Sequence, residues 1–264
     1  MINTKSLLIK LGRKFPRHLA LKNNDPYVGL QCGKLKERIS KIVLCLDLDA
    51  SILDEIIEIK PDLVITHHPF IYGTPAKVFE SDPSKKLIVD KLEANDIAVY
   101  SYHTNFDEGE GGMNDALAKA LNLENIHQLE TLPMARGGTL PTPMSAKEFA
   151  YYALDAFDVS YGLLIDEGEE VIETVALIGG GGSYHWYLAK DAGYDIYISG
   201  DIPHHRRREI TVSKYNYLDL PHEIERIFMP TMKKILLDIE ENLEVIIIDH
   251  EKLPKLIQEV ALND

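Results

Sequence analysis

Two adjacent histidines follow a short apolar run and are the residues of this chain best suited to bind metal ions. His67 and His68 come directly after residues 62–66, and Pro69 follows them. Short Leu/Val/Ile runs bounded by polar residues and proline are typical of strands covered on both faces. Sites in open α/β sheets lie just beyond the carboxyl ends of such strands. Because neighbouring strand residues point to opposite sides, we expect the two imidazoles to serve two ions about 3.5–4 Å apart.

A second apolar run ends in residues of the same kind. Residues 97–102 are β-prone, and His103 and Asp107 follow them. Asp107 offers a hard oxygen donor and His103 offers a nitrogen donor. An isolated His-His pair is more often a surface or hydrogen-bonded feature than a ligand pair. Two strands that end in donors at the same edge favour a metal site instead.

A third group of candidate ligands lies near the end of the chain. His222 and Glu225 follow Pro221, which suits the first position of a helix. On a helix, this spacing presents an imidazole and a carboxylate to one point. The alternative is a solvated first turn whose acidic residues complement the helix dipole. That alternative explains Glu223 well but leaves His222 without a role.

The order of apolar runs and amphipathic stretches predicts an α/β fold. Residues 42–46 form an expected strand, and residues 51–59 and 83–94 are expected crossover helices. We predict two similar α/β halves with mixed sheets, facing across a metal-containing cleft. Such an arrangement explains why the candidate ligands lie so far apart in the sequence.

The expected halves are residues 1–130, with the His-His-Pro segment, and residues 131–264, with His222 and Glu225. The polar stretch 131–144 contains two adjacent glycines and three prolines. Because such composition is typical of loops, we predict that this stretch is the junction between the halves.

Further polar residues follow an expected strand of the second half, over residues 194–199. Asp201, His204 and His205 are candidates to orient ligands or to carry protons. The competing interpretation for the two histidines is a basic surface, because residues 206–208 are all arginine.

A run of four glycines, Gly179 to Gly182, lies between an expected strand and an expected helix over residues 187–192. Backbone amides in such a turn can bind an anion. The run lacks the pattern of a phosphate-binding loop, so a tight strand-to-helix connection is an equally good interpretation.

Composition limits the class of protein. The chain of 264 residues has a formal net charge of −14, which disfavours a surface that binds duplex nucleic acid. Its two cysteines, Cys32 and Cys45, are not in a Cys-x-x-Cys arrangement, so we expect a reduced, cytoplasmic protein. No apolar stretch reaches the length of a membrane span.

Several ordered motifs resemble the Nif-three-like family, whose bacterial members are often called GTP cyclohydrolase I type 2 homologues. The resemblance spans essentially the whole chain. The motifs that carry it are Phe15-Pro16, Gly29-Leu30-Gln31-Cys32-Gly33, Leu46-Asp47-Leu48, Ile65-Thr66-His67-His68-Pro69, His103-Thr104-Asn105-Phe106-Asp107, Gly111-Gly112-Met113-Asn114-Asp115 and Ile198-Ser199-Gly200-Asp201-Ile202.

The resemblance implies a site with two divalent metal ions in each chain and a homohexameric toroid. Pro221 stands where the family usually has glycine, which leaves the aim of the neighbouring ligands open. Imidazole and carboxylate ligands suit Zn, Fe, Mn, Co or Ni. The ligands implied by the resemblance are His67, His68, Asp107, His222 and Glu225.

These observations lead to two hypotheses of function. The first is a metal-dependent hydrolase of a small phosphorylated or nucleotide-like substrate, in which His103 or His205 carries a proton. The second is a non-catalytic metal-binding or partner-binding assembly protein. A third interpretation, with purely structural histidines, fits the ordered motifs less well.

Overall fold

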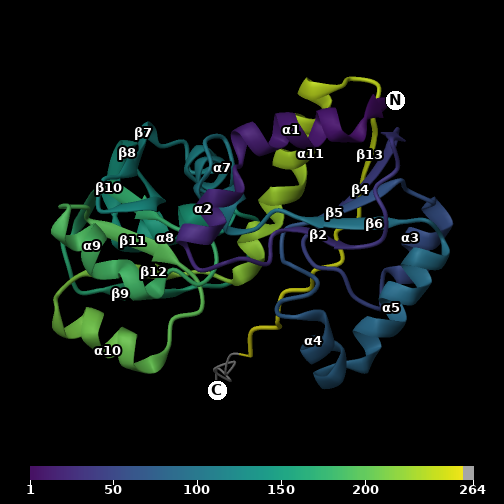
Figure 1. The fold of residues 1–264 in the computed structure, drawn as a ribbon. Coiled ribbons are helices and arrows are strands. Elements are labelled where there is room, and N and C mark those ends of the chain that lie inside the picture. Colours follow the sequence, from purple (N-terminus) through teal and green to yellow (C-terminus); the bar gives the residue numbers. More distant parts are fainter. Residues whose placement is uncertain (258–264) are drawn as a thin grey trace, which may run out of the picture. The chain divides into compact units, whose positions relative to one another are not determined.

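The computed structural model describes residues 1–257 of the 264-residue chain (Figure 1). Contacts between residues divide the chain into two compact units. The first unit consists of Met1–Ala116 and Arg226–His250. The second consists of Leu117–Glu225 and the described residues after His250.

The first unit is built on a five-stranded mixed sheet. Four of its strands are parallel, and β2 at one edge is antiparallel to β6. Cys45, Thr66 and Ser101, the last residues of three neighbouring parallel strands, are aligned in register. The residues that follow these strands therefore leave the sheet at one edge. In spatial order, the strands are β13 (Glu244–Ile247), β4 (Lys41–Cys45), β5 (Leu63–Thr66), β6 (Ala98–Ser101) and β2 (Gly29–Cys32).

Helices cover both faces of this sheet. Helices α3 and α5 pack on one face, where Val43, Val64 and Val99 form a shared core with Ile56 and Leu92. Helix α11 packs against β4 and β13 (Figure 1). A two-stranded sheet of β1 (Ile2–Asn3) and β3 (Arg38–Ile39) completes the strands of this unit. The helices are α1 (Thr4–Lys14), α2 (Arg17–Lys22), α3 (Leu53–Ile59), α4 (Pro75–Ser81), α5 (Pro83–Ala94), α6 (Thr104–Glu108) and α11 (Phe228–Ile239), and α7 (Met113–Ala120) runs on into the second unit.

The second unit has a six-stranded mixed sheet. Strands β10, β11 and β12 are parallel, and the other three pair in antiparallel fashion. Helices α9 and α10 cover one face, over the buried rings of Tyr197 and Tyr217. In spatial order, the strands are β7 (Glu124–Leu129), β8 (Leu132–Ser145), β10 (Val171–Leu177), β11 (Ile196–Ser199), β12 (Asn216–Asp219) and β9 (Leu163–Asp166). The helices are α8 (Ala146–Ala156), the 3-10 turn η1 (Ser183–His185), α9 (Trp186–Asp191), α10 (His204–Val212) and the 3-10 turn η2 (His222–Ile227).

The predicted α/β class with mixed sheets is confirmed. The expected halves, 1–130 and 131–264, differ from the observed units in two respects. The chain first crosses between units after Ala116, and Arg226–His250 belongs to the first unit. The second difference arises because β13 pairs in parallel with β4 and so extends the first sheet.

The prediction of a junction over residues 131–144 is wrong, because this stretch belongs to the long strand β8. Its glycines allow close packing within the sheet. A Cβ atom on Gly137 would lie 1.9 Å from the hydroxyl oxygen of Tyr194. Glycine inside a strand here marks the close approach of another side chain, which composition alone does not distinguish from a loop.

Within residues 1–257, no helix is long and apolar enough to span a bilayer.

Candidate metal centre

Three imidazoles meet at the edge of the first sheet. His67 and His68 follow β5, and their backbone amides both donate to the carbonyl of Leu46, at 3.2 Å. His103 follows β6, and its ring centre lies 5.1 Å from that of His67 and 5.6 Å from that of His68. One nitrogen from each ring lies within 4.8 Å of the others. The parallel strands therefore bring together donors that are 35 residues apart, as the sequence predicts.

Each of these imidazoles is held through its Nδ1 atom. The partner of His68 is Asp47 Oδ2 at 2.9 Å, and the partner of His103 is Asp25 Oδ2 at 2.7 Å. His67 Nδ1 donates to the carbonyl of Tyr102 at 2.9 Å. Because carbonyl and carboxylate oxygens are acceptors, Nδ1 carries the proton in each ring and Nε2 presents its lone pair. This is the arrangement that metal-binding histidines commonly show.

Asp107 places a carboxylate beside this group. It lies in the short helix α6 and is buried, with Oδ1 3.5 Å from Nε2 of His67. The side chain of Asn114 donates to the backbone carbonyl of Asp107 at 3.1 Å. Asn105, in the same helix, donates to the carbonyl of Phe15 at 2.8 Å. These two amides fix the helix, and with it the carboxylate.

The second unit carries its own pair of candidate ligands. His222 and Glu225 lie in the 3-10 turn η2, where residues three apart stand almost directly above one another. His222 Nε2 is 3.0 Å from Glu225 Oε2, and its Nδ1 is 2.6 Å from Asp201 Oδ2. The hydrogen bond to the buried Glu225 carboxylate, supported by the bond to Asp201, raises the pKa of His222 to about 9. The expected helix therefore begins as a 3-10 turn. In this turn, as in the expected helix, the three-residue spacing directs the His222 imidazole and the Glu225 carboxylate to one point.

The glycine run lies against this pair. Gly180 has a φ of +62°, and a Cβ atom there would lie 2.4 Å from Glu225 Oε1. The carbonyl of Gly180 accepts from the amide of Gly200 at 2.6 Å, which joins the ends of β10 and β11. The structure favours the interpretation of a tight strand-to-helix connection. Because Gly180 has no side chain, there is also room beside it for the Glu225 carboxylate.

The remaining histidine candidates lie elsewhere in the second unit. His204 and His205 are exposed on the first turn of α10, and the His205 ring is 6.3 Å from that of Tyr184. Among the described residues, neither belongs to a group of three possible metal donors. Arg206 lies over the Tyr184 ring at 4.5 Å and pairs with Glu209. These contacts favour the basic-surface interpretation of α10.

Sequence reasoning assigned no role to the two carboxylates that orient His68 and His103. Asp47 follows the strand β4, so its place at the same sheet edge as His68 was a usable signal. Asp25 lies in a loop 78 residues before His103, and no pattern in the sequence connects the two residues. Asp25 is buried and also accepts from the hydroxyl of Thr104 at 2.8 Å.

The donor chemistry fits a divalent transition-metal ion. Imidazole nitrogens with fixed tautomers and nearby carboxylates suit such ions better than calcium or magnesium, which prefer oxygen ligands. The fold and these donors define an α/β protein in which side chains able to bind metal follow the ends of parallel strands in each unit.

The chain belongs to the Duf34/NIF3 (NGG1p interacting factor 3) family, whose model matches residues 2–254. It is 31% identical to a protein of Streptococcus pneumoniae named GTP cyclohydrolase 1 type 2 homolog, over 81% of this chain and 83% of that protein. A Bacillus subtilis protein of the same name is 24% identical, over 83% of this chain and 88% of that protein. The crystal structure of a Bacillus cereus protein related to NIF3 shares the fold, with a TM-score of 0.86 and 21% identity, covering 97% of this chain and 99% of that one. The predicted family is confirmed.

Proposed function

We propose that this protein binds two divalent metal ions and hydrolyses a small phosphorylated or nucleotide-like substrate. The observation that carries the proposal is the state of the imidazoles. The three proposed imidazole ligands, His67, His68 and His222, each engage a carboxylate or carbonyl oxygen through Nδ1. Such bonds fix the tautomer that binds metal and raise the basicity of Nε2.

The proposed ligands combine three imidazoles with two carboxylates. Two carboxylate ligands offset only half of the charge of two divalent ions, so hydroxide, water or an anionic substrate can complete the coordination. When bound, such ions lower the pKa of a coordinated water and polarise the scissile group. The proposed ligands are His67, His68 and Asp107 from the first unit, and His222 and Glu225 from the second.

His103 is the proposed proton carrier. Asp25 accepts from His103 Nδ1 and also accepts the backbone amide of Tyr27, at 3.3 Å, so the carboxylate is held in place. The bond to this carboxylate orients the imidazole and leaves Nε2 to exchange a proton with substrate or water. His205 is the second candidate, but its exposed position on α10 provides less support.

The first test is elemental analysis of untagged protein purified without chelators or added metal. We expect roughly two ions per chain, as in other two-metal sites. The variants His68→Ala and Glu225→Ala should lose most of this metal, whereas the matched control His204→Ala should retain it. A metal-free parent that also fails to take up Zn, Mn, Fe, Co or Ni would contradict the proposal. The metal found then directs a substrate screen that includes GTP, because relatives carry the cyclohydrolase name.

A second function, a metal-binding protein that assembles with partners and has no catalytic activity, is supported by the family name, which describes an interacting factor. The two functions differ in a measurable way. The hydrolase predicts turnover by metal-loaded protein on a panel of phosphorylated and nucleotide substrates, and a loss of turnover in His103→Gln with metal retained. A metal-loaded protein with no turnover on this panel would favour the second function.

A further inference from the structure

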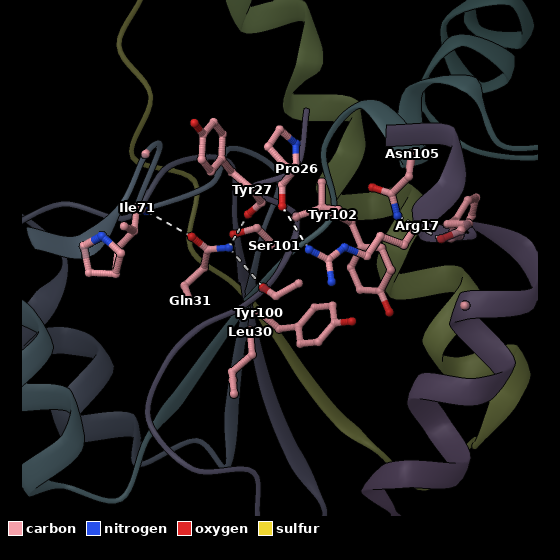
Figure 2. A pocket seen from close by; sticks show the side chains of 16 residues that line it. Arg17, Pro26, Tyr27, Leu30, Gln31, Ile71, Tyr100, Ser101, Tyr102 and Asn105 are labelled. Carbon is pink, nitrogen blue, oxygen red and sulfur yellow. Dashed lines mark hydrogen bonds between the residues drawn. The ribbon is translucent and has the colours of Figure 1, made fainter. Parts of the chain in front are cut away.

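A cavity of about 510 Å³ opens in the first unit, and none of the proposed metal ligands lines it (Figure 2). This volume falls within the usual range for sites that bind small molecules, about 300–1,000 Å³. Its walls come from β2, the end of β6, the start of α2, a residue each of α1 and α6, and the loops before β2 and α4. The cavity therefore belongs to one unit, and its shape is set by a sheet edge and short loops.

Arg17 gives the cavity its charge. Among the lining residues, all of which lie in the described part of the chain, Arg17 alone is charged. It donates one hydrogen bond, to the carbonyl of Pro26 at 3.1 Å, and within residues 1–257 it forms no ion pair. A guanidinium has five donors in a planar fork that matches carboxylate and phosphate groups. An arginine without an acidic partner in a chain of net charge −14 points to an anionic ligand.

Tyrosine rings form much of the remaining wall. The Tyr100 and Tyr102 rings are 5.1 Å apart at an angle of 35°, and Figure 2 shows them close to the Arg17 side chain. Tyr27 lies on another part of the wall, where its ring packs on that of Tyr72 at 4.7 Å. Burial raises the pKa of Tyr100 and holds that of Tyr102 well above its usual range, so both hydroxyls remain neutral donors. Aromatic walls of this kind favour a planar ring.

Gln31 holds the wall rigid. Its amide nitrogen donates to the carbonyls of Tyr27 and Gly29, at 2.7 and 3.1 Å, and its oxygen accepts from the amide of Ile71 at 3.0 Å (Figure 2). Binding to a pre-formed cavity costs less ordering entropy than binding to a mobile one.

We propose that this cavity binds a small ligand in which a planar aromatic or heteroaromatic ring carries a carboxylate or phosphate group. Arg17 binds the anionic group and the tyrosine rings contact the planar ring. The site is distinct from the candidate metal centre, although Ser101 relates the two: it lines the cavity and its hydroxyl donates to the carbonyl of His68 at 3.3 Å.

The test is calorimetric titration of the full, metal-loaded protein with benzoate and with phenyl phosphate. These two probes distinguish the carboxylate from the phosphate form of the ligand. Cyclohexanecarboxylate, which lacks the planar ring, and benzyl alcohol, which lacks the charge, serve as probe controls. We expect at least one aromatic anion to bind, and both control probes to bind about tenfold or more weakly, as expected when a ring contact or a charge-assisted hydrogen bond is lost.

Two arginine variants locate the binding. Arg17→Gln should weaken binding of the aromatic anion about tenfold or more, and Arg17→Lys should recover part of it. Arg13→Gln is the matched control, since Arg13 is an exposed arginine in α1 that does not line the cavity. Because Arg17 is exposed at the start of α2, its substitution should leave the melting temperature unchanged.

A Glu225→Gln variant separates this proposal from the metal-dependent function. The proposal predicts that the aromatic anion binds Glu225→Gln as tightly as it binds the parent. Binding that is lost in Glu225→Gln and kept in Arg17→Gln would assign the anion to the metal centre and overturn the proposal. Absence of binding by both aromatic anions at millimolar concentration would overturn it as well.

Discussion

At the scale of single residues, carboxylates that orient imidazoles are the main feature of the candidate centre. Asp47 is half-exposed, and its loss removes one hydrogen bond to His68 without opening the core. We therefore expect Asp47→Asn to fold normally and to bind metal about tenfold to a hundredfold more weakly, the usual effect of losing such a partner. Competition with a chelator of known affinity measures the change.

A matched control for Asp47→Asn lies two residues further on. Asp49 pairs with His250 at 3.2 Å, and within the described part of the chain neither residue belongs to a group of three possible metal donors. Asp49→Asn should leave metal affinity as in the parent. Equal losses in both variants would mean that general surface charge, rather than orientation of His68, controls affinity.

Asp219, at the end of β12, gives the second unit a pH-dependent stability. Burial raises its pKa to about 6, with a contribution from the Asp201 charge, while Arg207 and the amide of Ile202 act in the opposite direction. A raised carboxyl pKa means that the charged form is unfavourable in the folded state. The cost is absent below about pH 4 and complete above about pH 6, so this contribution lowers stability as pH rises through that window.

Asp219→Asn removes this cost, and the amide oxygen can still accept from the amide of Ile202. Relative to the parent, the variant should gain about 1–2 kcal/mol of unfolding free energy at pH 7.5, a figure reduced for the partial exposure of the group, and little at pH 4. Urea unfolding at the two pH values measures the difference. An equal gain at both, or a similar gain in the exposed control Asp238→Asn, would contradict the assignment.

At the scale of elements, the buried strands and the crossover helix α5 were the predictable parts. The expected helix at 83–94 coincides with α5, which begins at Pro83, where Asp82 accepts the amide of Ser84. The expected strands before His67 and His103 match β5 and β6 to within two residues, because strands covered on both faces are uniformly apolar.

The unpredicted parts depend on contacts between distant segments. Strand β8 resembles a loop in composition. Its residue Gly137 makes room for Tyr194, Gly138 makes room for Leu123, and its three prolines all lie where the strand is exposed. The pairing of Asp25 with His103 is of the same kind, because only the folded sheet edge brings the two together. Side-chain types and strand ends were therefore readable from the sequence, whereas the residues that orient the ligands were largely not.

The connection after β10 provides a prediction at the element scale. Gly180→Ala adds a methyl group 2.4 Å from Glu225 Oε1 and places alanine at a φ of +62°. The strained backbone costs about 1 kcal/mol, and the clash moves the carboxylate as well. We expect lower thermal stability together with a loss of bound metal, measured by elemental analysis.

Gly193→Ala is the control for backbone strain alone. Gly193 has a φ of +84°, and a Cβ atom there meets no atom within 4 Å. This variant should lose a similar amount of stability from strain and retain its metal. Equal metal content in the two alanine variants would show that Glu225 does not depend on the space at Gly180.

At the scale of the whole molecule, the family resemblance predicts a homohexamer. The negative charge of the chain opposes its assembly. Each chain of 29.8 kDa carries a net charge of −14, so association brings like charges together. A stable hexamer then needs an interface whose apolar burial contributes more free energy than this repulsion removes. The distance over which salt screens the repulsion is about 8 Å at physiological salt and about 30 Å at 0.01 M. We expect light scattering on eluting protein to give the mass of six chains at 0.15 M salt, and partial dissociation on dilution at 0.01 M. A mass of one chain at high protein concentration and 0.15 M salt would contradict the hexamer. If the assembly dissociates at high salt rather than at low salt, charge attraction, and not apolar burial, holds the chains together.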